Sequence, residues 1–283
     1  MKTCMFTGMF RNESFETAVK NAALLGFDAI EIRYHASHFE PDESESSLKE
    51  KAKYIRDAGL EVAEIYTFTG GFSTKSDAEC EKELETFRRE AEAACILGTD
   101  MVKISSGGPN AFLAKPYHFE KSAEWLARAA DIAERNHLRI SLEIHNGSLV
   151  EDIDHALQLI RMIGRDSVGL IHDAGNMYIT GEEYGEHSVE RLGDHLFHVH
   201  VKDVLRVSDS SLPNYFTNIT PRGEESFRLT ALNEGGVDHL PMLRALKKRN
   251  YQGYISLEAN ISMDAMEMAK HEYRELQNML KQL

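Results

Sequence analysis

The chain has 283 residues, of which 42% are hydrophobic, and its 32 basic and 46 acidic residues leave a net charge of −14. Such a charge repels phosphate backbones and anionic lipid headgroups, so it disfavours a nucleic acid or a membrane as partner. Three scattered cysteines argue against a disulfide framework, and no apolar run is long enough to span a bilayer, so we expect a cytoplasmic protein.

One pattern recurs along the chain: an amphipathic helical stretch, then Gly or Asn, then a short run typical of a β-strand. Gly26 precedes the first such run at residues 29–33, and the pattern returns at Gly59, Gly98 and Asn136. A residue that accepts the left-handed backbone conformation ends a helix at these points. An opening strand and three later ones complete a set of eight, at residues 3–8, 168–173, 196–202 and 254–258.

Eight strands that alternate with helices predict a (β/α)8 TIM barrel of the α/β class, with residues 1–283 forming one domain. A doubly wound open sheet would need a GxGxxG turn after its first strand, and FTGMFRNES lacks one. The longest stretch without periodicity, residues 208–225, follows the seventh strand. We expect an irregular loop there that caps the barrel mouth or packs against a second subunit.

Strand alternation turns acidic and imidazole side chains into the barrel at its carboxyl end. In RISLEIH the parity places Glu143 inside, and in VGLIHD it places Asp173 inside. LFHVHVKD and YISLE likewise turn His200 and Glu258 inward. Each acid taken alone fits an exposed strand end, but four such residues on consecutive strands at the catalytic face favour a functional site.

Three carboxylates that converge in a barrel mouth need a positive counter-charge. Two Glu, one Asp and one His suit one divalent metal ion, which could be Mn, Zn, Co or Mg. His198, one layer deeper, is expected to be a hydrogen-bonded core histidine. Glu31 and Lys103, on the second and fourth strands, fit either contacts to a ligand or internal ion pairs.

SLEIH, IHDAGNMYITGE, HVHVKDV and YISLEAN, in this order, resemble the xylose isomerase-like sugar phosphate isomerase/epimerase barrels, a group that also contains the AP endonuclease family 2. The resemblance covers most of the chain, and the specific motifs lie in its second half. It implies that one metal is bound by the same four residues: Glu143, Asp173, His200 and Glu258.

The chemistry that the resemblance implies is isomerisation or epimerisation of a small sugar, sugar acid or sugar phosphate. A metal would stabilise an enediolate while Glu143 and Glu258 move the proton. Arg206, six residues after His200, matches a substrate-binding Arg of the ketose 3-epimerases, although a surface charge is the alternative. The family's dimers and tetramers imply a homodimer or homotetramer.

Asn176 is a departure, because those epimerases carry a substrate-contacting His at this position. Asn can hydrogen-bond a hydroxyl but cannot take up a proton at neutral pH. His145, on the same strand face as Glu143, could supply the imidazole instead. A DNA-repair endonuclease is excluded, since Asn176 replaces one of its zinc ligands and no DxH pair follows His200 at a suitable place.

A dehydratase of an inosose- or dehydroshikimate-like keto-polyol stays open as the alternative. Such an enzyme also abstracts a proton next to a carbonyl, but it then needs a general acid over the leaving hydroxyl. His145, Lys202 or Lys103 could be that acid. A catalytically inactive sugar-binding barrel is a third reading. The expected substrate contacts are His145, Asn176, Lys202, Arg206 and Lys103.

Overall fold

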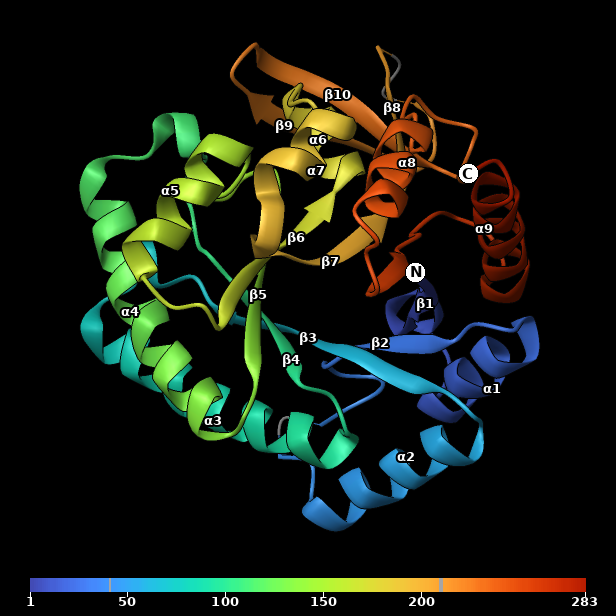
Figure 1. The fold of residues 1–283 in the computed structure, drawn as a ribbon, viewed down its shortest axis with the longest axis horizontal. Helices are drawn as coiled ribbons and strands as arrows, with labels where there is room; N and C mark the ends of the chain where they lie inside the picture. Colours follow the sequence, from blue (N-terminus) through green and yellow to red (C-terminus); the bar gives the residue numbers. More distant parts are fainter. Residues whose placement is uncertain (41, 209–210) are drawn as a thin grey trace.

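Eight parallel strands close into a barrel in the computed structural model, which describes residues 1–40, 42–208 and 211–283 (Figure 1). The order around the barrel is β1-β11-β7-β6-β5-β4-β3-β2, so β11 and β1 close the ring. This confirms the predicted (β/α)8 barrel. Its strands are β1 (Lys2–Phe6), β2 (Ala29–Arg33), β3 (Glu61–Gly70), β4 (Met101–Ser105), β5 (Arg139–Glu143), β6 (Val168–Asp173), β7 (Leu196–Val201) and β11 (Tyr254–Leu257).

The helices form the outer ring, and the chain ends lie on the same side of the barrel in Figure 1. Gly26 and Gly98 end two helices at φ 90° and 88°, as the sequence predicted, but after Arg135 the left-handed residue is His137 rather than Asn136. The helices are α1 (Phe15–Leu25), α2 (Glu45–Asp57), α3 (Asp77–Leu97), α4 (Pro116–Arg135), α5 (Ile153–Ile163), α6 (Ala174–Thr180), α7 (Glu186–Leu192), α8 (Leu240–Lys248) and α9 (Ala265–Leu280), with short 3₁₀ turns at Thr7–Phe10, Phe72–Thr74, Ala111–Leu113 and Gly193–His195.

The apolar core lies between the strands and the helices. Ile140, Leu142 and Val199 are fully buried there, and so are Leu126 and Leu159 on the facing sides of α4 and α5. The side chains with the opposite strand parity fill the barrel interior, where many of them are polar. This division is what positions the site, because it sends the charged strand-end residues inward together.

Residues 208–225 are not the irregular loop that the sequence predicted. The described part of this stretch contributes β9 (Tyr215–Thr220) and the start of β10 (Gly223–Thr230), which form an antiparallel three-stranded sheet with β8 (Asp203–Arg206). Residues 209 and 210 lie outside the described residues. Phe216 and Phe227 face each other across the hairpin with ring centroids 5.9 Å apart, and Gly223 takes a φ of 110° in its turn. Cross-strand packing of this kind stabilises a hairpin without a long apolar run.

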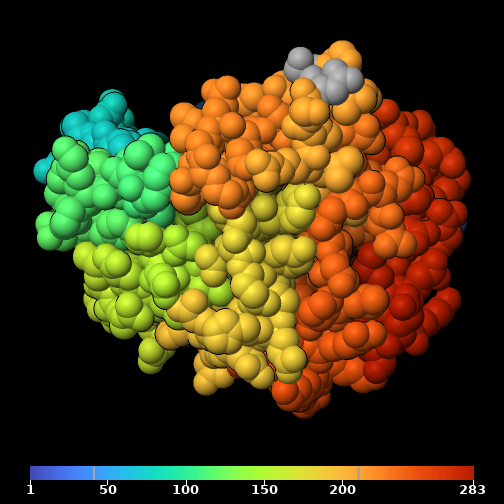
Figure 2. Space-filling view, turned by 90° about the horizontal axis from the view of Figure 1, so that it is seen from above, coloured from blue at the N-terminus to red at the C-terminus, as the bar shows by residue number. Residues whose placement is uncertain are grey.

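The three-stranded sheet spans loops that leave the carboxyl ends of the barrel strands. Asn110, after β4, donates its amide to the Ile219 carbonyl over 3.1 Å. Arg222 donates to the carbonyls of Ile179 and Thr180 in α6. In Figure 2 the orange surface of the hairpin accordingly lies against green and yellow surface from these segments. Whether it gates the barrel mouth or contacts a second subunit stays a prediction.

Within the described residues, no helix combines the length and the apolar character that crossing a bilayer requires.

Candidate active site

Four inward-facing side chains meet at the carboxyl end of the barrel. Glu143 ends β5, Asp173 ends β6, His200 lies in β7, and Glu258 directly follows β11. Their ligand-type atoms all lie within 4.8 Å of one another. His200 Nδ1 is 3.4 Å from Glu143 Oε1 and 3.6 Å from both Asp173 Oδ2 and Glu258 Oε2. The structure therefore brings together the four residues that strand parity selected, and we call them the mouth quartet.

The mouth quartet fits a divalent cation by its donor chemistry. Three carboxylates and one imidazole nitrogen suit Mn, Zn and related ions. Glu143, Asp173 and His200 are at most 4% exposed, so bulk water does little to neutralise their charge. Within the described residues Asp173 Oδ2 accepts no well-directed hydrogen bond, although the Lys202 ammonium lies 2.8 Å away. An acceptor left open in this way is available to a metal.

Lys202 supplies the positive charge that the mouth quartet needs. Its Nζ lies 2.8 Å from both Asp173 Oδ2 and Glu258 Oε2, and 3.9 Å from Glu143 Oε1. Burial alone would lower the pKa of Lys202, but the carboxylates outweigh this effect and raise it above its ordinary value. The predicted substrate contact thus holds the carboxylates in this structure.

Hydrogen bonds fix Glu143 from both sides. The Tyr66 hydroxyl donates to Oε2 over 2.7 Å, and the Asn176 amide donates to Oε1 over 3.1 Å and to the Ile144 carbonyl over 3.2 Å. Asn176, predicted to contact substrate, is thus engaged with the protein. The sequence analysis missed Tyr66, although alternation in EIYTF places it on the interior face with Glu64.

The pKa values of the two glutamates of the mouth quartet shift in opposite directions. Burial alone would raise the pKa of Glu143, but the hydrogen bond from His200 and the charges of His145 and Lys202 hold it well below its usual range. Burial raises the pKa of Glu258, and the Lys202 ammonium offsets this only in part. Glu258 is also the more open of the two, with a fifth of its side chain exposed.

A cavity of about 400 Å³ opens beside Glu143 and is large enough for a small cyclic polyol. Lys103 and His145 are among its lining residues, as are Tyr66 and Phe68. The Lys103 ammonium lies 3.9 Å from the centroid of the Tyr66 ring and 3.9 Å from Glu143 Oε2. Burial lowers the pKa of Lys103, and Glu143 counteracts part of that shift.

One known protein family matches most of this chain. The family described as "Xylose isomerase-like TIM barrel" matches residues 19–283. The chain belongs to this family.

Relatives of this xylose isomerase-like barrel are named as dehydratases and epimerases. An inosose dehydratase from Clostridium botulinum is 24% identical over 262 residues, which span 88% of this chain and 83% of the relative. Among solved structures, a probable 3-DHS dehydratase, AsbF from Bacillus anthracis, has a TM-score of 0.80 at 20% identity and covers 98% of this chain and 99% of its own. Both of these proteins are named as dehydratases.

Two further structures share the fold of the xylose isomerase-like barrel. The IOLI protein with a binding zinc atom has a TM-score of 0.81 at 19% identity, and covers 100% of this chain and 99% of its own. An L-ribulose 3-epimerase has a TM-score of 0.79 at 20% identity, and the match covers 99% of this chain and 95% of the epimerase chain. At these identities the likeness shows the fold alone.

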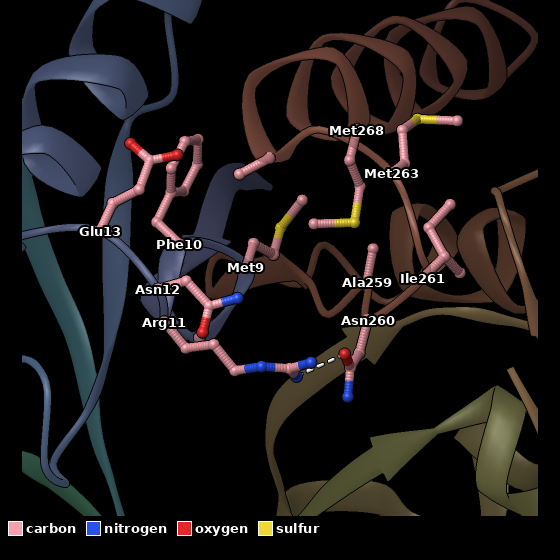
Figure 3. A pocket seen from close by; sticks show the side chains of 12 residues that line it. Met9, Phe10, Arg11, Asn12, Glu13, Ala259, Asn260, Ile261, Met263 and Met268 are labelled. Atoms are coloured by element: carbon pink, nitrogen blue, oxygen red, sulfur yellow. Dashed lines mark hydrogen bonds between the residues drawn. The ribbon is translucent and has the colours of Figure 1, made fainter.

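Arg206 and a second, smaller hollow lie apart from the cavity beside Glu143. Arg206 is not among the lining residues, and its guanidinium pairs with Glu225 on β10, so its contact with substrate stays a prediction. A smaller hollow of about 160 Å³ lies between the segments after β1 and β11. Figure 3 shows Met9 and Met268 facing each other across it, and Arg11 hydrogen-bonded to Asn260.

Proposed function

We propose that this protein is a metal-dependent lyase that removes water from a small inosose- or dehydroshikimate-like keto-polyol. The observation that carries the proposal is a cavity whose lining contains a carboxylate and two proton donors. Glu143, the buried Lys103 and the half-buried His145 all line it. The dehydratase names of the relatives support the same reaction class.

Dehydration divides the work between a base and an acid. A carboxylate accepts the proton from the carbon next to the carbonyl, the bond from the neighbouring carbon to its hydroxyl breaks, and a positioned acid protonates the leaving hydroxide to give water. We assign the base to Glu258, the more exposed glutamate of the mouth quartet, which adjoins Glu143 at the edge of the cavity rather than lining it. We assign the acid to Lys103 or His145, which line the cavity. Asn176 takes no part in proton transfer, because its amide is held by Glu143 and Ile144.

A divalent cation held by Glu143, Asp173, His200 and Glu258 would polarise the substrate carbonyl and stabilise the negative charge that develops on its oxygen. The other residues of the mouth prepare for this charge. Tyr66 and Asn176 fix the orientation of Glu143, and Lys202 holds Asp173 and Glu258 together until a cation takes its place. Preorganised groups of this kind do not need to reorient during the reaction.

Epimerisation is the second candidate function. Glu143 and Glu258 approach His200 Nδ1 within 3.4 and 3.6 Å, so two carboxylates adjoin one site, as a two-base proton exchange requires. The fold shared with an L-ribulose 3-epimerase fits this candidate. Asn176 disfavours epimerisation. The ketose 3-epimerases carry a histidine at this position, whereas the Asn176 amide already donates to Glu143 and Ile144.

Incubating the metal-loaded protein with an inosose, 3-dehydroshikimate and L-ribulose in D2O distinguishes the candidates. The proposal predicts a product that is lighter by one water from one of the first two compounds, detected by mass spectrometry and NMR. A product of unchanged mass apart from deuterium next to the carbonyl means epimerisation or isomerisation, and the dehydratase proposal then fails. Lys103→Met and His145→Gln identify the acid, since only the true acid variant should be slowed by about 10²–10⁴-fold.

A further inference from the structure

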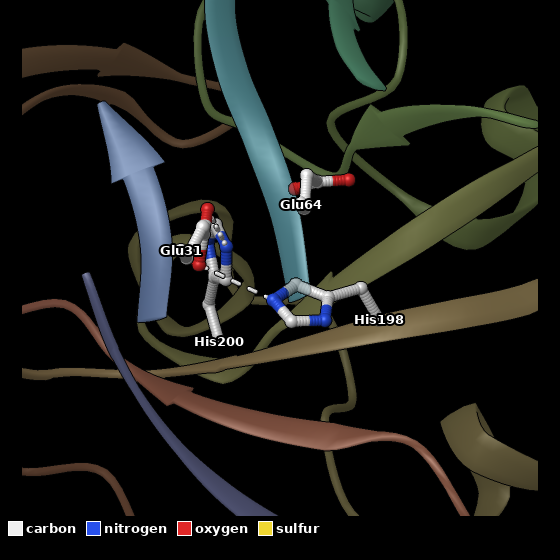
Figure 4. A group of neighbouring side chains, drawn as sticks. All are labelled: Glu31, Glu64, His198 and His200. Atoms are coloured by element: carbon white, nitrogen blue, oxygen red, sulfur yellow. Dashed lines mark hydrogen bonds and ion pairs between the residues drawn. The ribbon is translucent and has the colours of Figure 1, made fainter. Parts of the chain in front are cut away.

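A second group of ionisable side chains lies directly below the mouth quartet. Glu31 on β2, Glu64 on β3 and His198 on β7 are fully buried, and their ligand-type atoms lie within 4.8 Å of one another and of His200. We call Glu31, Glu64 and His198 the floor group. Figure 4 shows the Glu31 carboxylate close to the His200 ring and joined by a dashed line to His198, whereas no dashed line reaches Glu64.

Glu31 is the hydrogen-bonding centre of the floor group. Its Oε1 lies 3.0 Å from His200 Nε2, its Oε2 lies 3.2 Å from His198 Nε2, and the Ser256 hydroxyl also donates to Oε2. A carboxylate can accept from all three donors at once, which no neutral side chain of its size can do. The proposed reaction itself assigns Glu31 no role, since none of its surface is exposed.

The two ring nitrogens of His200 face opposite ways. Nε2 faces Glu31, whereas Nδ1 faces Glu143, Asp173 and Glu258. In a neutral imidazole one nitrogen carries the proton and the other offers a lone pair. Without a metal, Nδ1 donates to Glu143. A metal binds an imidazole through a deprotonated nitrogen. Because the Glu31 carboxylate has no proton to donate, Nε2 keeps its proton, and Nδ1 is the nitrogen that can offer a lone pair.

We propose that Glu31 is a positioning residue that fixes the tautomer and ring orientation of His200, so that Nδ1 is the nitrogen presented to a metal. The inference rests on the metal centre of the proposed function and adds a residue to it. A carboxylate behind a ligating histidine makes the ligand more basic and locks its ring, and loss of such a partner typically weakens metal binding by about 10–100-fold. His198, bonded to the other oxygen, keeps the Glu31 carboxylate from rotating away.

The test compares Glu31→Gln with Glu64→Gln. Both replace a fully buried floor carboxylate by an amide of the same shape, but only Glu31 contacts His200. Glutamine offers one acceptor oxygen, so it cannot serve both histidines. We expect zinc and manganese affinity, measured by competition with a chelator, to fall about 10–100-fold in Glu31→Gln and to stay near wild type in Glu64→Gln. Circular dichroism checks that each variant folds.

NMR of the ¹⁵N-histidine-labelled, zinc-loaded wild type gives a readout that does not need a variant. The proposal predicts that His200 is protonated at Nε2 and coordinated through Nδ1. A His200 coordinated through Nε2, or unprotonated there, overturns it. An equal loss of affinity in Glu64→Gln also overturns it, because the floor group would then itself be a ligand set. If the predicted tautomer is found and no substrate is dehydrated, only the proposed function fails.

Discussion

The mouth quartet and the floor group contain carboxylates and imidazoles in two adjacent layers of the barrel interior, yet their charges are balanced differently. In the mouth, the Lys202 ammonium contacts Asp173 and Glu258 at 2.8 Å. In the floor, the partners of Glu64 and Glu31 are hydroxyls and imidazoles. Fixed positive charge at the mouth lets several carboxylates stay ionised in one place, which is the state a metal needs.

The protonation of the two layers follows from these partners. Burial alone would raise the pKa of both Asp173 and Glu64. Lys202 and His200 outweigh burial at Asp173 and lower its pKa. At Glu64 the nearby charge of Glu31 adds to burial, the Ser141 hydroxyl compensates little, and the pKa rises well above its usual range. The surroundings thus favour the ionised form of Glu143 and Asp173 in the mouth, and the protonated form of Glu64 beneath them.

The largest effect should come from the proposed base. Glu258→Gln removes the proton acceptor, so we expect turnover of the identified substrate to fall by about 10²–10⁴-fold. Glu124→Gln, on the exposed side of α4, is the control and should leave turnover unchanged. Steady-state kinetics measure both variants. Turnover that stays near the wild-type rate in Glu258→Gln would remove this carboxylate from the chemistry.

Asp173→Asn should lower the metal affinity of the protein, whereas Glu64→Gln in the floor group should not. The asparagine oxygen can still accept the hydrogen bond from the backbone N–H of Asn176, but the side chain loses the charge that a cation requires. Because a direct ligand matters more than a supporting residue, affinity should fall by more than about 100-fold. Elemental analysis and calorimetry measure it, with Glu64→Gln as the floor control. Equal metal content in wild type and Asp173→Asn would take Asp173 out of the ligand set.

The sequence predicted the barrel and the mouth quartet because both depend on short-range regularities. The helix, Gly and strand rhythm marked eight strands, and strand parity turned Glu143 and Glu258 inward. The partners across the barrel were not predictable in this way. Tyr66 reaches Glu143 across a sequence separation of 77 residues, and Lys202 meets Glu258 across 56. Such contacts depend on the stagger of the strands, which no local pattern encodes.

The three-stranded sheet was missed for a different reason. FRLT alternates apolar and polar residues, which is typical of a strand, but YFTNIT does not, and its strand is mostly half-buried or exposed. The prediction weighted the length of the aperiodic stretch instead. The sequence predicted the floor group in part. His198 is the hydrogen-bonded core histidine that the sequence indicated. Glu31 pairs with His198 and His200 inside the barrel, which is one of the two alternatives left open for it.

A pair of serine variants should distinguish the ionised from the neutral floor carboxylate. Ser256→Ala removes a donor to Glu31, and a hydrogen bond to a charged group contributes about 1.5–3 kcal/mol. Ser141→Ala removes the partner of the neutral Glu64, for which about 0.5–1.5 kcal/mol is expected. Urea unfolding gives the free energy of both. A larger loss in Ser141→Ala would reverse the assigned protonation states.

The smallest effect concerns pH and Glu64. Its folded pKa lies above the unfolded value of about 4.3, so the native state keeps a proton that the unfolded chain releases. This stability is fully present below about pH 4.3 and is lost as the pH rises toward the folded pKa. The melting temperature of Glu64→Gln should therefore fall less than that of wild type as the pH is raised from about 4.3 through the folded pKa of Glu64. Parallel melting curves in both proteins would show that Glu64 is ionised in the folded state.

Anomalous diffraction from crystals grown with manganese tests the contrast between the layers most directly. The account predicts one peak at the manganese edge, surrounded by Glu143, Asp173, His200 Nδ1 and Glu258, and no peak below it. The ion would displace the Lys202 ammonium from its contacts with Asp173 and Glu258. A peak between Glu31, Glu64 and His198, or none at the mouth at saturating manganese, would contradict the assignment of the mouth as the reactive metal centre.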